Sequence, residues 1–441
     1  MSSDRAERVT APVEWGRWRR SQSAARIELN RTSGCLMILT VVHAGEGGTI
    51  LTNEDLMRAL ARDKHLCFIL SCGPRKWVLE SVANEVVRRQ EVTFEHDWRS
   101  WEAPREDRMV AFRDLVQRLL PDVVHLRSFL GCGPEIASEA KCLGCGVVVS
   151  YHDYSAVCPN IHLLDAAGHH CAGTCTPDPE DCSAPEKWFA GMARLKNGYV
   201  HDWRARVSQA LSQADYHVTT SPSAARLLRR QLRHLHDRRV RVIEHGRHAK
   251  RLRAARIPTP NEPPAVLVLG AKEEAKGRRL VEDLIARNRA SGGPFVFHLL
   301  GGREPVEVDL EGGVVRHGPY RRDDLPVMLQ EIGPSFSLVA SIWPETFSHT
   351  LTESWLAGVP VLASNLGAPA ERVRVCGGGW LLDPHDPAAW WATLSRASKD
   401  PRDWAAKARE IELIKFRDSA AMARDYAELY ARAAARRCVR R

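Results

Sequence analysis

The segment 341–353, SIWPETFSHTLTE, combines a carboxylate with a helix start, an arrangement that can hold an anionic ligand. An apolar run ends in a loop that carries Glu345, and the pattern predicts a helix that begins near Ser348. The first amides of that helix, including those of Thr350 and Leu351, have no partner within the helix and favour negative charge. We therefore predict an anion site at this helix start.

Glu353 lies about one turn inside the predicted helix, and two interpretations of it stay open. With Glu345 it forms a pair of acidic residues that seven positions separate, and a ligand at the helix start could contact both. Thr350 and Glu353 also fit a capping box, in which the glutamate side chain only satisfies a backbone amide. Spacing alone does not choose between ligand binding and capping.

Glycines follow the first apolar run, which ends at His43. The sequence 43–49, HAGEGGT, places Gly47 and Gly48 at a turn from strand to helix, where glycine lets the backbone approach a ligand and the helix amides favour phosphate. The run lacks the third glycine of the dinucleotide-binding fingerprint. A tight turn without a ligand is the alternative interpretation.

A cysteine-rich insertion covers residues 158–182 and contains two adjacent histidines. Thiolate and imidazole groups favour tetrahedral zinc, so the segment predicts a structural zinc site. The insertion has no pair with the C-x2-C spacing, and ordinary buried thiols are the alternative. The candidate zinc ligands are Cys158, Cys171, Cys175 and Cys182.

Short apolar runs alternate with amphipathic segments along the chain, as expected of parallel sheets covered by helices on both faces. One series spans residues 35–220 and a second spans residues 265–363, so the sequence predicts two doubly wound α/β domains that face a cleft. A helix is predicted between Trp77 and Arg89, and one long helix from Asp403 to about Ala435. The predicted divisions are a polar leader (1–34), an N-terminal domain (35–246), a linker (247–264), a C-terminal domain (265–400) and a C-terminal helix with a basic tail (401–441).

Length and composition exclude several classes of protein. The chain has 441 residues, of which 44% are hydrophobic and 27% charged, and this fits globular domains rather than disorder or coiled coil. No apolar run approaches the ~18 residues of a membrane-spanning helix, and the N-terminus lacks the apolar core of a secretory signal. The twelve cysteines then favour reduced thiols or metal ligands in the cytosol. The net charge of +9 favours anionic partners, but no nucleic-acid-binding pattern appears, and we expect no nucleic acid partner.

The run 343–372, WPETFSHTLTESWLAGVPVLASNLGAPAER, resembles the donor-site motif of family 4 glycosyltransferases, which are retaining enzymes of the GT-B fold. The resemblance covers about residues 35–400 and is greatest to bacterial members that build polysaccharides. It implies two Rossmann-like domains and a nucleotide-sugar site in the second. Further matches follow in order: HAGEGGT (43–49), YHDYSAVCP (151–159), VTTSPSAARLL (218–228), VLGAKEEAKG (268–277), HGPY (317–320) and GGGWLLDP (377–384).

The resemblance implies roles for individual residues of this sequence. Glu353 would hold the ribose hydroxyls of the nucleotide, and the loop at Glu345 would lie against the donor sugar. Lys276, which precedes Gly277, would neutralise the diphosphate. Phosphate charge grows as the glycosidic bond breaks, and a fixed cation stabilises that state more than the ground state.

His152 follows the predicted strand 147–151, and the resemblance implies that it contacts hydroxyls of the donor sugar. Two other interpretations are a general base formed with Asp153 and a histidine that only ends the strand. A base is disfavoured, because retaining transfer in the family is thought to proceed on one face of the sugar without one.

The same resemblance places Gly47 and Gly48 on the phosphate side of the cleft, but two other positions depart from the family pattern. Ala271 stands where an arginine is usual. Either Lys272 supplies the missing positive charge, or the diphosphate site is weaker than in the family. Ser348 stands where glycine is common, and serine suits the N-cap of a helix.

These features predict a cytosolic glycosyltransferase that moves a sugar from a nucleotide-sugar donor to a glycan or lipid-linked acceptor, with retention of configuration, in polysaccharide biosynthesis. The resemblance implies that catalysis needs no cofactor. A nucleotide-sugar epimerase of the same fold and a non-catalytic nucleotide- or partner-binding protein are the alternatives. Basic residues at the C-terminus predict peripheral contact with anionic lipid at the inner membrane face. They are Arg432, Arg436, Arg437, Arg440 and Arg441.

Overall fold

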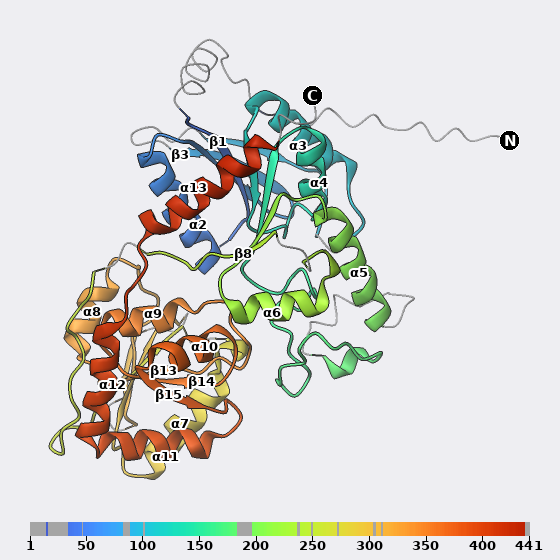
Figure 1. The fold of residues 1–441 in the computed structure, drawn as a ribbon. Coiled ribbons are helices and arrows are strands. Elements are labelled where there is room, and N and C mark those ends of the chain that lie inside the picture. The colour runs from blue at the N-terminus through green and yellow to red at the C-terminus, as the bar shows by residue number, and fades with distance from the viewer. Residues whose placement is uncertain are drawn as a thin grey trace. The chain divides into compact units, whose positions relative to one another are not determined.

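The computed structural model of the protein describes Trp15 and residues 34–45, 47–82, 89–99, 102–182, 196–235, 239–247, 250–270, 273–302, 306–309 and 312–436. The chain forms two compact units, each assembled from separate segments, and helices flank a sheet in both (Figure 1). The domain boundaries expected from the sequence stay a prediction. The first unit comprises Met1–Ser150, Arg206–Val218 and Ala420–Arg441, and the second comprises Tyr151–Ala205 and Thr219–Ser419.

The first sheet is parallel at its centre. Its order is β4-β3-β2-β1-β5-β6-β7-β8, and β1 pairs in parallel with both β2 and β5. The strands are β1 (Met37–His43), β2 (Leu66–Cys72), β3 (Lys76–Val82), β4 (Arg89–Thr93), β5 (Val123–Leu126), β6 (Gly146–Tyr151), β7 (Tyr216–Thr219) and β8 (Val240–Val242). The helices that accompany them are α2 (Gly48–Arg62), α3 (Glu106–Leu119), α4 (Glu135–Cys142), α5 (Lys196–Leu211), α6 (Pro222–Gln231) and α13 (Ser419–Ala435).

The helix predicted between Trp77 and Arg89 is wrong, because this stretch contributes to a hairpin. Strand β3 pairs antiparallel with β2, and β4 pairs antiparallel with β3. The Gly73 amide donates to the Lys76 carbonyl (2.9 Å), so the chain reverses directly after β2. Trp77, which is fully buried, lies opposite Cys72 in the ladder. Pairing of the backbone with β2 outweighs the helical spacing of the apolar residues.

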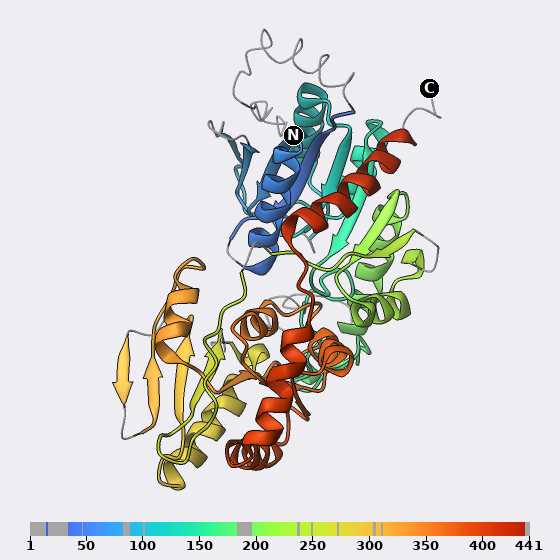
Figure 2. The same cartoon turned by 60° about the vertical axis from the view of Figure 1, so that its left-hand side comes forward.

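The second sheet has the order β11-β12-β10-β9-β13-β14-β15, and β11 pairs antiparallel with β12 at one edge (Figure 2). Its strands are β9 (Ala265–Leu269), β10 (Val296–Leu300), β11 (Glu307–Asp309), β12 (Val314–Arg316), β13 (Phe336–Val339), β14 (Val361–Ser364) and β15 (Gly379–Leu382). The helical segments are the 3-10 turn η5 (Glu274–Lys276), α7 (Arg278–Ala290), α8 (Leu325–Ile332), α9 (His349–Leu356), α10 (Gly367–Cys376), α11 (Pro387–Ser398) and α12 (Pro401–Leu413).

Successive residues of β9 enter different hydrophobic cores, as the alternation of side chains along a strand requires. Val266 and Val268 pack with side chains of α7, α11 and α12 on one face. Leu267 and Leu269 pack with Leu325 and Leu329 of α8 on the other face. Helices therefore cover both faces of a mostly parallel sheet, and the predicted doubly wound α/β fold is confirmed.

The single C-terminal helix predicted from Asp403 to about Ala435 is wrong, because the chain forms α12 and α13 there. Helix α12 ends where Ile414 takes an extended conformation, with φ −67° and ψ 125°. Ile414 and Phe416 pack against a hydrophobic core, and the Arg251 guanidinium lies 4.9 Å from the centre of the Phe416 ring. This packing interrupts the helix although the stretch contains neither glycine nor proline.

Among the residues that the structure describes, no helix is long and apolar enough to cross a membrane. At the basic C-terminus, Arg432 pairs with Glu428 at 2.5 Å, and the Arg436 guanidinium lies 5.1 Å from the centre of the Tyr216 ring. Lipid contact by this tail stays a prediction. The remaining tail arginines, Arg437, Arg440 and Arg441, lie outside the described residues.

Candidate functional site

Lys276 lies in a turn that packs directly on the segment after β13. It ends the 3-10 turn η5, and the Ala275 carbonyl in that turn accepts a hydrogen bond from the Ile342 amide (3.0 Å). Gly277 has a φ of 83°, and a Cβ atom there would lie 2.0 Å from the carbonyl oxygen of Ala340. Glycine alone fits this contact, and the close approach brings Lys276 to the loop that carries the donor motif.

Glu345 lies in that loop and forms an ion pair with Lys276. Its Oε1 is 2.9 Å from the Lys276 Nζ, and its side chain also accepts a hydrogen bond from the Ser341 hydroxyl. The backbone of Glu345 is fixed on both sides, because its amide donates to the Trp343 carbonyl and its carbonyl accepts from the Ala368 amide, each at 2.9 Å. Two residues predicted to share a site are thus in direct contact.

The ion pair keeps the Glu345 carboxylate charged although the residue is only 4% exposed. Burial raises the pKa of this carboxyl group, but the charge of Lys276 and hydrogen bonds from Ser341, Lys276 and Ser348 outweigh burial and hold the pKa below its ordinary value. The Lys276 side chain is 30% exposed. Its ammonium group can therefore approach an anionic ligand while it stays close to the Glu345 carboxylate.

Helix α9 starts directly after the loop, with Ser348 as its N-cap. The Ser348 hydroxyl accepts a hydrogen bond from the Leu351 amide (3.4 Å) and lies 3.1 Å from the Thr350 hydroxyl. The cap has φ 72° and ψ 98°, in the left-handed region that favours glycine. Serine therefore caps this helix at the cost of backbone strain. One of the amides predicted to face an anion, that of Leu351, already has a partner.

Glu353 forms an ion pair with Arg247, and the capping-box interpretation is wrong. The Arg247 Nη1 lies 2.5 Å from the Glu353 Oε1, and the two side chains are 8% and 13% exposed. The N-cap of α9 is Ser348 rather than Thr350. Burial, followed by the negative charge of Glu353, raises the pKa of the Tyr320 hydroxyl, whereas Arg247 lowers it. A phenol, a carboxylate and a guanidinium therefore lie close together here.

His152 reaches the start of α9 through a stack of three imidazole rings. The His152 and His245 rings are 5.1 Å apart with an interplanar angle of 15°, and the His245 and His349 rings are 5.1 Å apart at 25°. The Phe347 ring meets His245 edge to face at 5.0 Å. Asp153, weighed as part of a general base, accepts a hydrogen bond from the Ser155 amide (2.8 Å). The structure brings His152 together with the donor motif.

Three side-chain hydrogen bonds fix the donor loop to the segments around it. The Thr346 hydroxyl donates to the His152 carbonyl, and the Thr220 hydroxyl donates to the Thr346 carbonyl, both at 2.8 Å. The Tyr154 hydroxyl donates to the Pro344 carbonyl, also at 2.8 Å. Each bond is at least partly buried, so the backbone on both sides of Glu345 is held in place before any ligand binds.

Arg247, His245 and Arg372 are site residues that the sequence reasoning missed. Arg372, in α10, donates to the carbonyls of Phe347 (3.1 Å) and Ser348 (3.0 Å). These two hydrogen bonds hold the end of the donor loop at the start of α9. A signal for it was present, because Arg372 ends the donor-motif run 343–372. Arg247 and His245 follow an apolar run directly, at the carboxyl end of β8, where ligand-binding residues often lie in α/β sheets.

Gly47 and Gly48 belong to the first unit, where they begin helix α2. Gly47 has a φ of 134°, and a Cβ atom there would meet nothing within 4 Å. Glycine is therefore favoured here by the backbone conformation and not by a close contact with a neighbour. Ala271 and Lys272 lie outside the described residues. The contributions of Gly47, Gly48 and Lys272 to donor binding stay predictions.

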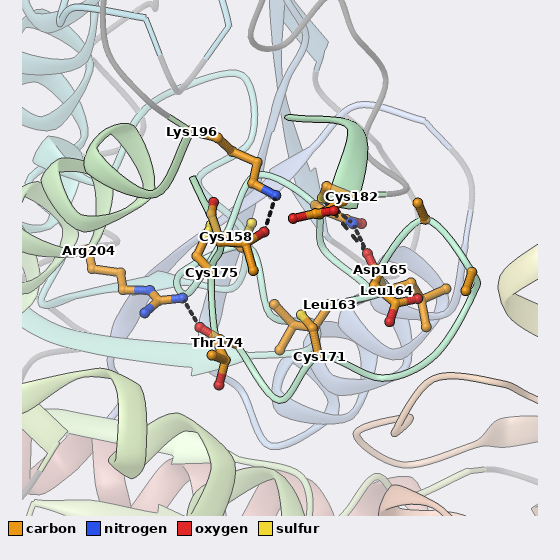
Figure 3. Close-up of a pocket in the computed structure, with 16 residues that line it drawn as sticks. Cys158, Leu163, Leu164, Asp165, Cys171, Thr174, Cys175, Cys182, Lys196 and Arg204 are labelled. Carbon is orange, nitrogen blue, oxygen red and sulfur yellow. Dashed lines mark hydrogen bonds between the residues drawn. The ribbon is translucent and has the colours of Figure 1, made fainter. Parts of the chain in front are cut away.

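The four candidate zinc ligands, Cys158, Cys171, Cys175 and Cys182, all line one pocket of about 410 Å³ in the second unit (Figure 3). Each carries a free thiol. Over the described ranges, no three His, Cys, Asp or Glu side chains already stand around a common metal position. The structure therefore gathers the cysteines, and the zinc site itself stays a prediction.

Two family models match this chain in succession. The model described as "Glycosyltransferase Family 4" matches residues 47–251, and the model described as "Glycosyl transferases group 1" matches residues 251–411. The second match contains the Lys276–Glu345 and Glu353 positions of the site.

Similar proteins and structures point the same way. A D-inositol 3-phosphate glycosyltransferase from Salinispora arenicola (strain CNS-205) is 37% identical over 83 residues, 19% of this chain and 18% of that protein. A probable sucrose-phosphate synthase 2 from Oryza sativa subsp. japonica is 29% identical over 100 residues, 22% of this chain and 10% of that protein. The chain thus aligns with less than a fifth of the length of either relative.

Two solved structures share the fold over almost the whole chain. A sucrose-phosphate synthase from Thermosynechococcus elongatus has a TM-score of 0.60 at 18% identity and covers 91% of this chain and 100% of its own. Anabaena Alr3699/HepE in complex with UDP and glucose has a TM-score of 0.56 at 13% identity and covers 89% of this chain and 99% of its own.

Proposed function

We propose that this chain, which belongs to the family 4 glycosyltransferases of the GT-B fold, transfers a sugar from a nucleotide-sugar donor to a hydroxyl of a glycan or lipid-linked acceptor. The transfer retains the configuration of the anomeric carbon and serves polysaccharide biosynthesis. The observation that carries the proposal is the Lys276–Glu345 ion pair, which lies beside the start of α9 with Glu353 one turn further along the helix.

Lys276 is the proposed catalytic cation. Its ammonium group is partly exposed, and Glu345 holds it at 2.9 Å. As the bond between the anomeric carbon and the diphosphate oxygen breaks, the leaving diphosphate gains negative charge, which a fixed ammonium group stabilises more than it stabilises the intact donor. Because the pair sits on a turn and a loop locked by backbone contacts, this charge is in place before the reaction begins.

Glu353 is proposed to accept hydrogen bonds from the ribose hydroxyls of the nucleotide. A carboxylate accepts such bonds strongly, and one oxygen of Glu353 is already held by Arg247. The other oxygen and the neighbouring Tyr320 hydroxyl are the groups that we propose for contact with the nucleoside. Arg247 therefore acts as a positioning residue, because it orients the carboxylate without a required contact to the nucleotide.

His152 is proposed to contact hydroxyls of the transferred sugar. Stacking on His245 fixes the ring, and its backbone carbonyl is held by Thr346 of the donor loop. The Asp153 carboxylate is engaged with a backbone amide, which does not favour a His152–Asp153 general base. A retaining transfer on one face of the sugar needs no such base.

Structural neighbours support a nucleotide-sugar donor. Anabaena Alr3699/HepE was solved with UDP-glucose, and a starch synthase IV from Arabidopsis thaliana was solved with ADP and acarbose. The donor of this chain is therefore to be sought first among UDP-sugars and ADP-sugars.

The experiment that tests the proposal incubates the purified chain with each nucleotide sugar in turn, with and without a glycan or lipid-linked acceptor fraction, and measures nucleotide release. Release that requires acceptor, with an α-linked product from an α-linked donor by NMR, is the expected result. Conversion of the donor sugar without acceptor would instead identify an epimerase. Nucleotide binding without turnover of any donor would identify a non-catalytic protein.

A further inference from the structure

The cysteine-rich insertion surrounds a pocket that four of its cysteines line. All four cysteines of the insertion line it, and no histidine does, although three histidines lie in the same segment. The same pocket is lined by Lys196 and Arg204 from helix α5 (Figure 3). A soft, sulfur-rich site with cationic neighbours is the feature that remains unexplained by glycosyl transfer.

Arg204 is a buried cation with no carboxylate partner in the described part of the chain. Its side chain donates to the carbonyls of Val157 (2.8 Å) and Gly173 (2.5 Å) and to the amide oxygen of Gln231 (2.9 Å). It is 9% exposed. Burial lowers its pKa, and the groups that raise it again are Cys158, Cys175 and Cys171. A buried charge of this kind requires a compensating charge nearby.

Lys196 is a second such cation. It is 3% exposed, and its Nζ donates to the Thr176 hydroxyl (3.0 Å). Neither Lys196 nor Arg204 has an ion pair with a described carboxylate, although Asp165 and Asp181 line the same pocket. Asp181 is exposed to water, and Asp165 accepts the His169 amide instead (2.8 Å). The two buried positive charges therefore lie at a pocket that holds four sulfurs, and neither is paired with a described carboxylate.

We propose that Cys158, Cys171, Cys175 and Cys182 bind one Zn²⁺ as a structural tetrahedral site. Four thiolates and one zinc ion carry a net charge of −2, which the two buried cations beside them offset with +2. The carboxylates of Asp165 and Asp181 also line the pocket, but they are more exposed to water than the two cations. Zinc binding displaces the four thiol protons to solvent. The site takes no part in the transfer reaction.

Hydrogen-bond donors around the sulfurs suit thiolates. The side-chain amide of Asn160 donates to the Cys182 Sγ (3.5 Å). Burial raises the pKa of Cys158 and Cys171, and the backbone amides of Asn160 and Gly173, which donate to these sulfurs, lower it again only in part. Donors of this kind orient and stabilise metal-bound sulfur in zinc sites.

Side chains must rearrange before four sulfurs can share one metal ion, because no three metal-ligating side chains among the described residues already stand together. The Cys175 Sγ lies 3.7 Å from the Thr176 carbonyl, and the Cys182 Sγ lies 3.8 Å from the Leu164 carbonyl. These are contacts of protonated thiols, which donate to carbonyls. A thiolate cannot donate, so deprotonation by zinc removes the reason for both orientations. This accounts for the lack of a preassembled metal position among the described side chains.

An anionic ligand in place of zinc fits the pocket less well. The Arg204 guanidinium already directs its Nε, Nη1 and Nη2 groups at two carbonyls and one amide oxygen. It can therefore balance charge but offers few donors to grip a phosphate or carboxylate. Zinc also closes a loop that contains few apolar side chains, because metal binding supplies folding free energy.

The test measures zinc and iron by plasma mass spectrometry in the full chain purified without chelator. We expect about one zinc per chain, as a four-cysteine structural site requires, and negligible iron. The double variant Cys171→Ser with Cys175→Ser should lose the zinc, whereas Cys142→Ser, at an exposed cysteine of α4, should keep it. Lys196→Met should weaken zinc affinity roughly 10- to 100-fold, the usual effect of removing a group that supports metal ligands.

The proposal is supported if the wild-type chain binds one zinc, the double variant loses it and Lys196→Met binds it more weakly. If the double variant fails to fold, the wild-type stoichiometry and the Lys196→Met affinity still test the site, because both are measured independently of that variant. Metal-free protein with four titratable thiols in the insertion, disulfides between them, or iron in place of zinc would overturn it. Metal content is measured without an activity assay, so its outcome is independent of the proposed transferase function.

Discussion

The Glu353 carboxylate lies 2.5 Å from the Arg247 guanidinium, and the two side chains are almost completely enclosed. This pair joins the donor motif to the residues that follow β8. It shows that the second acidic residue of the motif has a structural partner as well as a proposed ligand. Substitutions at Glu353 therefore change both stability and binding, and the two effects must be separated.

Glu353→Gln should weaken nucleotide binding by roughly 1.5 to 3 kcal/mol, because an uncharged amide is a poorer acceptor for ribose hydroxyls than a carboxylate. It should also lower the free energy of unfolding by about 1 to 3 kcal/mol, since Arg247 loses its charged partner. Calorimetry with the nucleotide and urea unfolding measure the two effects. The control is Arg247→Gln combined with Glu353→Gln, which should regain stability but not affinity. Recovery of affinity in the double variant would mean that Glu353 acts only on Arg247.

Removing the Lys276 charge should make stability depend on pH in a defined way. In the wild-type protein the pKa of Glu345 lies below its ordinary value, so the ion pair stabilises the fold at neutral pH and this contribution is lost as pH falls through that depressed pKa. In Lys276→Met only the hydrogen bonds from Ser341 and Ser348 oppose burial, and the pKa of Glu345 should rise. The stability difference between the two proteins should be largest near pH 7 and smaller at a pH below the depressed pKa of wild-type Glu345, where this carboxyl group is protonated in both proteins. Urea unfolding at both pH values gives the comparison, and an equal difference at each would contradict it.

Ser348→Gly should leave the protein as stable as the wild type or more stable by about 1 kcal/mol. Glycine relieves the strain of a φ of 72°, typically about 1 to 3 kcal/mol, and replaces a serine cap at a cost of only a few tenths. Ser348→Ala keeps the strain and removes the cap, so it should lose about 1 kcal/mol. Thermal unfolding of both variants measures these differences in stability. If the glycine variant is less stable than the alanine variant, the Ser348 backbone is not strained.

His349→Phe should make the free energy of unfolding depend less on pH under acidic conditions. Burial and nearby positive charge hold the pKa of His349 well below its ordinary value, so the folded state binds its proton later than the unfolded state. Stability should then fall as pH drops below about 6.5, by up to about 1.4 kcal/mol per pH unit, and the variant should lose that slope. His201→Phe, at an exposed position, is the matched control and should keep it. The charged neighbours are His245, Arg247, Arg322 and Arg372.

Much of the fold could be predicted from the sequence, because buried parallel strands leave short apolar runs at regular spacing. The strand predicted over 147–151 differs from β6 by one residue, and the first apolar run ends at His43, where β1 ends. Local pattern failed where pairing or packing decided the outcome. The β3 strand depends on the turn at Gly73, and the break between α12 and α13 depends on the packing of Ile414 and Phe416.

The site was predictable only as far as its motif is contiguous. Glu345, Ser348 and Glu353 stand in one run of sequence, and Lys276 follows a strand that neighbours theirs. Arg247 meets Glu353 across 106 positions of the chain, and no local pattern records that contact. The strain at Ser348 was equally hidden, since an N-cap serine usually has an extended backbone.

The most direct test of the donor site is the steady-state kinetics of Lys276→Ala, measured as acceptor-dependent nucleotide release. The proposal requires kcat to fall at least 100-fold while KM for the donor changes less than tenfold, because the ammonium group stabilises charge that develops as the glycosidic bond breaks. Lys399→Ala, at the exposed end of α11, should match the wild type. If Lys276→Ala instead raises KM with kcat unchanged, or retains full activity, Lys276 is not the catalytic cation and the proposed mechanism is wrong.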